Sequence, residues 1–219
     1  MEINRIFHDY EITYSVKGTE VVSENPAFIY GFEDELPMTD FPGLVLVTLT
    51  GADWEKDFSP YPHSKVFHGG HDFAGQGPQF LARLFRMVPV IEEALSLQPS
   101  QRILAGYSLA GLAALDASLM SDLFSGIACV SGSVWYPGYL AKLAKTPCLA
   151  KAVYFSIGSH ESETRNPVLS TARDCQEKAA ALLAKQGKKT LFEVNDGGHF
   201  VDVTPRVEKG IRWLLENLS

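Results

Sequence analysis

The sequence predicts an α/β fold with a mostly parallel central sheet, helices on both faces and no large cap domain. Short apolar runs rich in β-branched residues recur along the chain, and segments with helical spacing lie between them. Strands that alternate with helices pair in parallel, and their helices cover both faces of the sheet. The 219 residues, 46% of them hydrophobic, fit a single domain over 1–219 and leave little room for a cap.

The N-terminal part of the chain contains the first predicted strands. Residues 5–16 alternate apolar and polar side chains, as a half-buried strand does. A second strand is expected over 27–32. The run over 44–49 is almost continuously apolar, which is typical of a strand buried on both faces.

Helices and strands alternate in the rest of the chain. Gly187 is expected to stop the penultimate helix, and Thr204 and Pro205 are expected to open the last one as N-cap and first-turn residue. The predicted helices are 80–95 (with a kink or restart at Pro89), 109–119, 175–186 and 204–218, and the predicted strands are 102–105, 127–130, 153–157 and 191–194.

Composition and charge exclude several classes of protein. The formal net charge of −7 argues against nucleic acid or an anionic membrane as the main partner. No run approaches the roughly 18 apolar residues of a membrane span, and the first residues lack the apolar stretch of a signal peptide. The three widely spaced cysteines indicate neither a disulfide framework nor a zinc site. We therefore expect a soluble, cytoplasmic protein.

The segment 106–111, Gly-Tyr-Ser-Leu-Ala-Gly, lies between a predicted strand and a predicted helix. This is the setting of a nucleophile elbow, in which a serine is exposed on a strained turn. The residues two positions away must be small, as Gly106 and Ala110 are around Ser108, although the usual motif has glycine in place of Ala110. The segment also fits a serine that merely caps a helix, so the partners of Ser108 decide between the two interpretations.

The partners of such a serine follow in the chain order serine, acid, histidine. His199 comes directly after the last predicted strand, on a loop in which two glycines permit a sharp turn, and is the predicted general base. An inert surface histidine is the alternative. Glu161 follows the strand 153–157 and is the predicted acid. The other carboxylates considered are Glu163 first, then Asp196 and Asp202, and a serine–histidine dyad without an acid is also open.

Two backbone amides are expected to form an oxyanion hole. One is the amide of Leu109, the residue after the nucleophile. The other should come from the loop after strand 44–49, from Ala52 or Asp53. The segment His68-Gly69-Gly70, which resembles the H-G-G of many esterases, is the second choice.

Aromatic residues gather in the same loops and are expected to line a pocket for a small-molecule ester. The candidates are Trp54, Tyr107, Trp135 and Tyr136, with Phe58, Tyr61 and Tyr139 nearby. Ordinary packing accounts for any one of them equally well. The spacing of His63, His68 and His71 matches no known metal site, so no metal is expected.

Taken together, these motifs resemble an α/β-hydrolase esterase family that includes enterochelin (siderophore) esterase-like and feruloyl esterase-like serine hydrolases. The resemblance covers most of the chain from about Leu44 onward. It is carried by TGADW at 50–54 with Asp57 and SPY at 59–61, MVPVIE at 87–92, GYSLAG at 106–111, SGSVWY at 131–136, GSHE at 158–161 and GGHF at 197–200.

The resemblance implies an α/β-hydrolase fold, a Ser108–Glu161–His199 triad and cleavage of a carboxylic ester through an acyl-enzyme, without a cofactor. Two positions depart from the family pattern, Ala110 and Ser159, the latter standing where an aspartate is common. Because folds and sites are inherited more safely than substrates, the resemblance does not name the ester. Transfer of the acyl group to an acceptor other than water, and an inactive binding protein with the same fold, are the alternatives.

Overall fold

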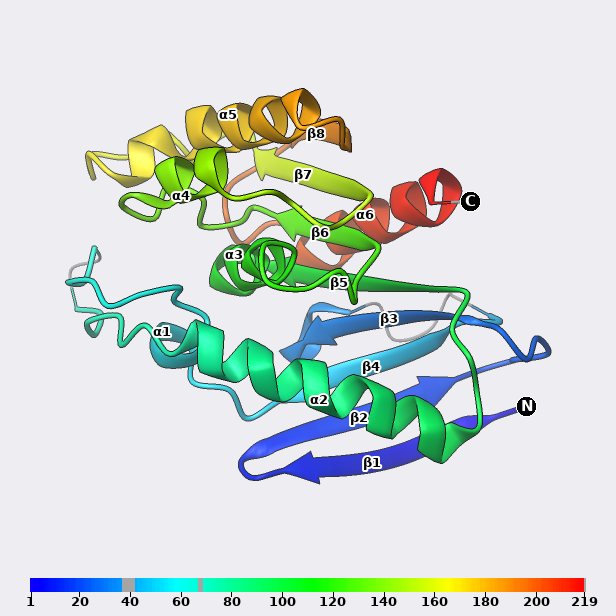
Figure 1. The fold of residues 1–219 in the computed structure, drawn as a ribbon. Coiled ribbons are helices and arrows are strands. Elements are labelled where there is room, and N and C mark those ends of the chain that lie inside the picture. Colours follow the sequence, from blue (N-terminus) through cyan, green and yellow to red (C-terminus); the bar gives the residue numbers. More distant parts are fainter. Residues whose placement is uncertain (37–41, 67–68, 219) are drawn as a thin grey trace.

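The computed structural model describes residues 1–36, 42–66 and 69–218. It contains an eight-stranded sheet in the order β1-β2-β4-β3-β5-β6-β7-β8 (Figure 1). Strands β1 and β2 pair antiparallel, as do β2 and β4, whereas β3 to β8 run parallel to one another. The strands are β1 (Ile3–Asp9), β2 (Ile12–Gly18), β3 (Ala27–Phe32), β4 (Val45–Thr50), β5 (Gln101–Tyr107), β6 (Gly126–Val130), β7 (Ala152–Gly158) and β8 (Lys189–Asn195).

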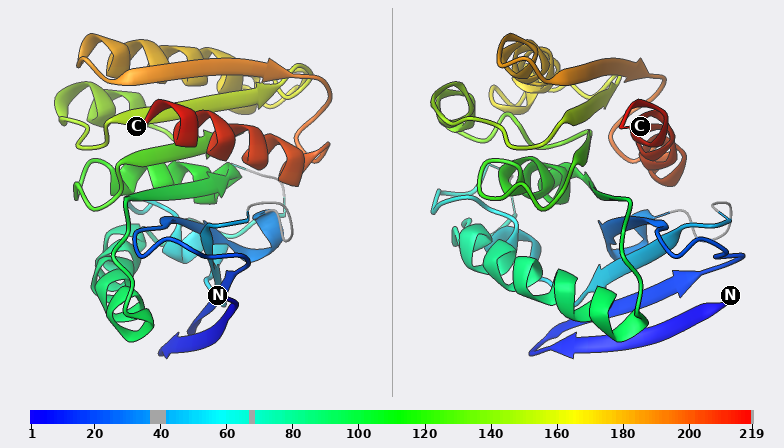
Figure 2. Two further views of the ribbon diagram at one scale, coloured as in Figure 1. Left: turned by 90° about the vertical axis from the view of Figure 1, so that its right-hand side faces the viewer. Right: turned by 45° about the vertical axis from the view of Figure 1, so that its right-hand side comes forward.

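Helices cover both faces of the sheet, as Figure 2 shows. Helices α2 to α5 lie on one face, and α6 packs on the other against β5, β6 and β7. The helices are α1 (Trp54–Asp57), α2 (Gly77–Leu95), α3 (Ser108–Ala117), α4 (Tyr139–Lys145), α5 (Ala172–Lys185) and α6 (Val203–Asn217), with 3-10 turns η1 (Glu33–Glu35) and η2 (Leu169–Thr171). The predicted α/β-hydrolase fold is therefore confirmed.

The predicted amphipathic faces form the core on both sides of the sheet. On α2 the buried stripe includes Phe80, Leu84 and Ile91, and the helix runs through Pro89 without ending there. On α6 the buried stripe includes Val207 and Ile211. Because both stripes follow the helical period, they can face the sheet along their whole length.

Four details of the structure differ from the prediction. Residues 5–16 form a hairpin, in which Tyr10 takes a left-handed conformation (φ 56°) at the turn. The alternation of side chains continues across the turn, so it does not reveal the break. Strand β4 alternates buried with half-buried side chains. Helix α6 begins after Asp202 rather than at Thr204, and the short helices α1 and α4 were not predicted.

The carboxyl ends of the parallel strands meet at one edge of the sheet, where the loops after β4, β5, β6, β7 and β8 come together. Every predicted reacting group lies on one of these loops. None of the helices in the described residues is both long enough and apolar enough to cross a bilayer.

Candidate active site

Ser108 lies at the junction of β5 and α3 in a left-handed conformation, with φ of 55°. A residue with a side chain adopts this conformation only when its surroundings impose it. A Cβ added to Gly106 would lie 2.4 Å from the carbonyl oxygen of Ala110, so the turn closes only with glycine there. The methyl group of Ala110 is completely buried and is accommodated. The backbone is thus the strained strand-to-helix turn that the motif predicts.

The side chains of Ser108, His199 and Glu161 form one chain of hydrogen bonds. The Oγ atom of Ser108 is 3.1 Å from Nε2 of His199, and Nδ1 of His199 is 2.7 Å from Oε2 of Glu161. Both distances are within hydrogen-bonding range. The three residues follow β5, β8 and β7, so the sheet brings together groups that are far apart in sequence.

The second oxygen of Glu161 is held by three other donors. Oε1 accepts hydrogen bonds from the amide of Gly158 (2.6 Å), the hydroxyl of Ser131 (2.7 Å) and Nη1 of Arg206 (3.1 Å). Burial raises the pKa of this carboxyl, but hydrogen bonds from His199, Ser131 and Gly158 outweigh that effect and hold the pKa below its usual 4.5. Glu161 is therefore a carboxylate at neutral pH.

Arg206 connects the segments that carry these groups. Its side chain is 2% exposed and comes from helix α6. Besides Glu161, it donates to the hydroxyl of Tyr107 (3.1 Å) and to the carbonyl of Asp196 (2.7 Å). Tyr107 in turn donates its hydroxyl proton to the carbonyl of His199 (2.6 Å). One buried cation thus contacts the residue before Ser108, the carboxylate of Glu161 and the loop that carries His199.

A second buried carboxylate lies behind the turn that carries Ser108. Glu35 in η1 is 7% exposed and accepts a hydrogen bond from the amide of Tyr107 (2.9 Å). Burial raises the pKa of Glu35 well above its usual 4.5, and this hydrogen bond offsets only part of the effect. The turn is therefore supported by a side chain from a distant segment.

Among the described residues, none of the three alternative carboxylates is hydrogen-bonded to the imidazole of His199. Glu163 is largely exposed and pairs with Nδ1 of His160 at 3.0 Å. The carboxylate of Asp196 accepts a weak hydrogen bond from Ser159 (3.3 Å), and Asp202 occupies the N-cap position of α6. The contact with the imidazole therefore distinguishes the predicted acid from its alternatives.

Hydrogen bonds within the loops reduce the number of amides that could form the expected oxyanion hole. Leu109 is in the first turn of α3, where amides have no partner within the helix. The amide of Asp53 donates to the carboxylate of Asp57 (3.0 Å) and is therefore engaged in its own loop. This corrects the expectation for Asp53 and leaves the amide of Ala52 as the second candidate. His68 of the rival segment lies outside the described residues.

A cavity of about 300 Å³ opens beside Ser108. Its walls are mainly aromatic and aliphatic, and Phe200 at its rim is 90% exposed. It is lined by Ser108, Trp135, Glu161, Leu169, Ala172, His199 and Phe200.

Four aromatic residues were expected to line the pocket, and of these Trp135 lines this cavity. Tyr107 is 4% exposed and lies beneath the histidine loop. Tyr136 is 1% exposed and donates its hydroxyl proton to the carbonyl of Tyr61, while Trp54 packs edge-on against a core phenylalanine. Tyr107 and Tyr136 are thus buried, and Trp54 is half-buried against the core. None of the three lines the cavity beside Ser108, which corrects the expectation for them.

Sequence reasoning missed Ser131, Arg206 and the cavity residue Phe200. Ser131 directly follows β6, so the carboxyl-edge rule applied to that strand identifies it. Arg206 lies on the buried stripe of α6, one helical turn before Gly210, and a charged residue in an apolar stripe is a recognisable signal. Phe200 adjoins the predicted base, but nothing in the pattern indicates that its ring faces a cavity.

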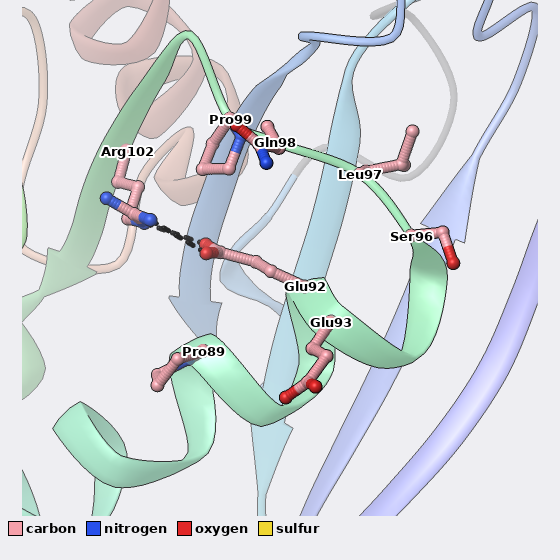
Figure 3. Close-up of a pocket in the computed structure, with 8 residues that line it drawn as sticks. All are labelled: Pro89, Glu92, Glu93, Ser96, Leu97, Gln98, Pro99 and Arg102. Carbon is pink, nitrogen blue, oxygen red and sulfur yellow. Dashed lines mark hydrogen bonds and ion pairs between the residues drawn. The ribbon is translucent and has the colours of Figure 1, made fainter.

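A larger hollow, of about 560 Å³, lies at the other end of the sheet (Figure 3). There Arg102 donates two hydrogen bonds of 2.7 Å to Glu92, which also accepts one from the hydroxyl of Tyr30 (3.0 Å). Arg102 is near the start of β5 and Ser108 follows its end, a separation of roughly 20 Å along the strand. The larger hollow therefore does not reach the predicted nucleophile.

Within the described residues, no group of three or more histidine, cysteine, aspartate or glutamate side chains is arranged to hold a metal ion.

In sequence, the chain is similar to a curated protein over part of its length. No family model matches the sequence. Over 134 residues the chain is 29% identical to the uncharacterized protein YbbA of Bacillus subtilis (strain 168); the match covers 58% of this chain and 53% of that protein. The chain thus spans about half the length of this curated relative.

Among solved structures, the chain resembles three hydrolases in fold. An IroE-like serine hydrolase from Shewanella oneidensis is 18% identical with a TM-score of 0.75, and the match covers 100% of this chain and 81% of that one. The siderophore hydrolase EstA from Aspergillus nidulans is 16% identical with a TM-score of 0.78 (100% and 95% covered). The enterobactin esterase FES from Shigella flexneri is 17% identical with a TM-score of 0.68 (100% and 60% covered). The fold is therefore shared with hydrolases of the group that the sequence motifs resemble.

Proposed function

We propose that the protein is a serine hydrolase that cleaves a carboxylic ester through an acyl-enzyme formed on Ser108. The observation that carries this proposal is the hydrogen-bonded chain from Ser108 Oγ through the imidazole of His199 to the carboxylate of Glu161. This is the arrangement that activates a serine hydroxyl for attack on a carbonyl carbon.

In the first half of the reaction, Nε2 of His199 takes the hydroxyl proton while Oγ of Ser108 bonds to the carbonyl carbon. The imidazolium then protonates the oxygen of the leaving alcohol, and the carbon–oxygen bond to the alcohol breaks. Water repeats the sequence on the acyl-enzyme and releases the carboxylic acid. Glu161, ionised through its lowered pKa, orients the ring and stabilises its cationic form.

The oxyanion formed in each half needs donors fixed in advance. We assign this role to the amides of Leu109 and Ala52, which lie after β5 and β4 at the same edge of the sheet. Each such donor lowers the barrier by roughly 3–4 kcal/mol in serine hydrolases. The fold is shared with proteins named serine hydrolase, siderophore hydrolase and enterobactin esterase, which supports ester cleavage as the chemistry.

The experiment combines active-site labelling with a matched pair of variants. A fluorophosphonate probe is expected to label Ser108, identified by peptide mass spectrometry, and p-nitrophenyl acetate is expected to be hydrolysed. Ser108→Ala should abolish labelling and lower kcat by about 10⁴-fold or more. Ser23→Ala, which changes an exposed serine in the loop before β3, should do neither. Labelling at another residue, or a Ser108→Ala variant with wild-type activity, would contradict the proposal.

A further inference from the structure

Phe200 is unusual among the apolar side chains because it is 90% exposed beside the proposed catalytic base. Its ring stands edge-on to the imidazole of His199, with 5.0 Å between centroids and an interplanar angle of 85°. Covering a phenylalanine side chain is favourable, so a ring left in water next to reacting groups can gain from a bound ligand. Tyr10 is equally exposed (88%), but it lies on the β1–β2 turn.

The walls of the cavity define what this ligand can be. Trp135, Leu169 and Ala172 provide apolar surface opposite the reacting groups. No lysine or arginine is among the described residues that line it. The carboxylate of Glu161 is present, with one oxygen bound to His199 and the other to Arg206. An anionic group entering here would lose hydration and find no lysine or arginine on the cavity walls to pair with, since the carboxylate of Glu161 already engages Arg206.

The cavity volume limits the size of the group. About 300 Å³ is at the lower end of the range for small-molecule sites. The cavity therefore holds one small substituent of an ester rather than a whole large substrate.

We infer that the cavity receives an uncharged, apolar substituent of the ester, which packs against Phe200 and Trp135, so that the enzyme selects neutral esters over anionic ones of the same length. This inference rests on the proposed function, because it concerns the substrate of the same site. It makes Phe200 a residue that determines specificity.

The test compares esters matched in length. One series varies the acyl group: p-nitrophenyl acetate, p-nitrophenyl hexanoate and mono-p-nitrophenyl adipate. A second keeps the acetyl group and varies the alcohol: ethyl acetate, hexyl acetate and 6-acetoxyhexanoate. In at least one series, kcat/KM should rise from the short ester to the hexyl or hexanoyl ester and fall at least about tenfold for its anionic counterpart. Equal rates for neutral and anionic esters in both series would overturn the inference.

Variants at the cavity rim sharpen the test. Phe200→Ala should lower kcat/KM for the preferred six-carbon ester by about tenfold, and for the acetate by a smaller factor, because the ring contributes apolar contact only to the longer group. Phe200→Arg should narrow the ratio between neutral and anionic esters, because it supplies the missing cation. Tyr10→Ala is the control for loss of an exposed aromatic ring and should leave both ratios unchanged. If the Phe200 variants lower all rates by one common factor, the ring only supports His199 and the inference is wrong.

Failure of this inference is distinguishable from failure of the proposed function. Labelling of Ser108 and hydrolysis of p-nitrophenyl acetate test the function. If both are present but the ratio of neutral to anionic rates is near one, the ester hydrolase stands and the selectivity does not.

Discussion

Two glutamates in this molecule are buried against an arginine, one at each end of the sheet. Glu92 uses both carboxylate oxygens on Arg102, and one oxygen also accepts from Tyr30. In Glu161, one carboxylate oxygen accepts a hydrogen bond from Arg206 and the other is hydrogen-bonded to His199. The side chains of both glutamates are about equally inaccessible, at 6% and 4% exposure. Burial and an arginine partner therefore do not distinguish the proposed catalytic acid Glu161 from Glu92; the hydrogen bond between Glu161 and an imidazole does.

The largest expected effect separates these two carboxylates by activity. Glu161→Gln should lower kcat about 10³- to 10⁴-fold, because an amide no longer stabilises the imidazolium or fixes the tautomer of His199. Glu92→Gln, the matched substitution in α2 beside the start of β5, should leave kcat within about twofold of wild type. Steady-state kinetics on p-nitrophenyl acetate measures both. Similar losses in the two variants would remove the distinction.

The second prediction concerns the two arginines. Arg206→Met leaves the buried carboxylate of Glu161 without its cation, so the free energy of unfolding should fall by about 3–5 kcal/mol. Arg102→Met should cost less, because the side chain of Arg102 is already 29% exposed. Urea unfolding measures the stabilities.

Activity measured on the folded fraction separates the roles of these arginines. We expect kcat to fall in Arg206→Met, to recover in part in Arg206→Lys, and to stay near wild type in Arg102→Met. If kcat of folded Arg206→Met equals that of wild type, Arg206 stabilises the fold without positioning the site.

The third prediction uses pH to contrast Glu161 with the buried Glu35. The pKa of Glu161 is lowered in the folded state, so its stabilising contribution is present above pH 4.5 and is lost as the pH falls through the folded-state pKa. The pKa of Glu35 is raised, so its contribution is present below pH 4.5 and is lost as the pH rises. Compared with wild type, Glu161→Gln should be less stable at neutral pH and similar in acid.

For Glu35→Gln the sign is opposite. This variant should gain stability relative to wild type as the pH is raised above 4.5, because in wild type the carboxyl ionises freely in the unfolded chain but is kept protonated by burial in the folded one. Thermal melts across the pH range measure both variants. A difference between Glu35→Gln and wild type that does not change with pH would contradict the assignment.

The smallest expected effect tests the runner-up acid. Glu163 is exposed and pairs with His160, also exposed, so Glu163→Gln should change kcat by no more than about twofold and the free energy of unfolding by less than about 1 kcal/mol. The same ester assay provides the measurement. A loss comparable to that of Glu161→Gln would exchange the roles of the two residues.

Sequence patterns predicted the order of strands and helices and the positions of the site residues at the strand ends. The apolar run before Gly106 and the spacing of the helical segments were sufficient to predict the sheet. The position of His199 after the last strand was sufficient to predict that it lies near Ser108, to which it is hydrogen-bonded. These features depend on periodicity and on the meeting of strand ends at one edge.

The remainder depends on contacts between distant segments. Whether Ala52 or Asp53 has a free amide is decided by the carboxylate of Asp57, and the interaction of Arg206 with Glu161 is decided by how α6 rotates on the sheet. Aromatic residues in loops look alike in a sequence, whether they fill the core as Tyr136 does or line a cavity as Trp135 does. Local patterns do not contain that information.

Helix α6 links the candidate site at one edge of the sheet to the packing between α6 and the face of the sheet that it covers. Gly210 lies one turn from Arg206, and a Cβ at this position would come within 2.7 Å of the ring of Tyr154. A bulkier residue there would push the helix outward and draw the guanidinium away from Glu161 without touching any reacting group. In a deep mutational scan for esterase activity, substitutions on the side of α6 that contacts the sheet would then lower activity as much as substitutions in the candidate site. Unfolding curves of the variants would distinguish the two groups.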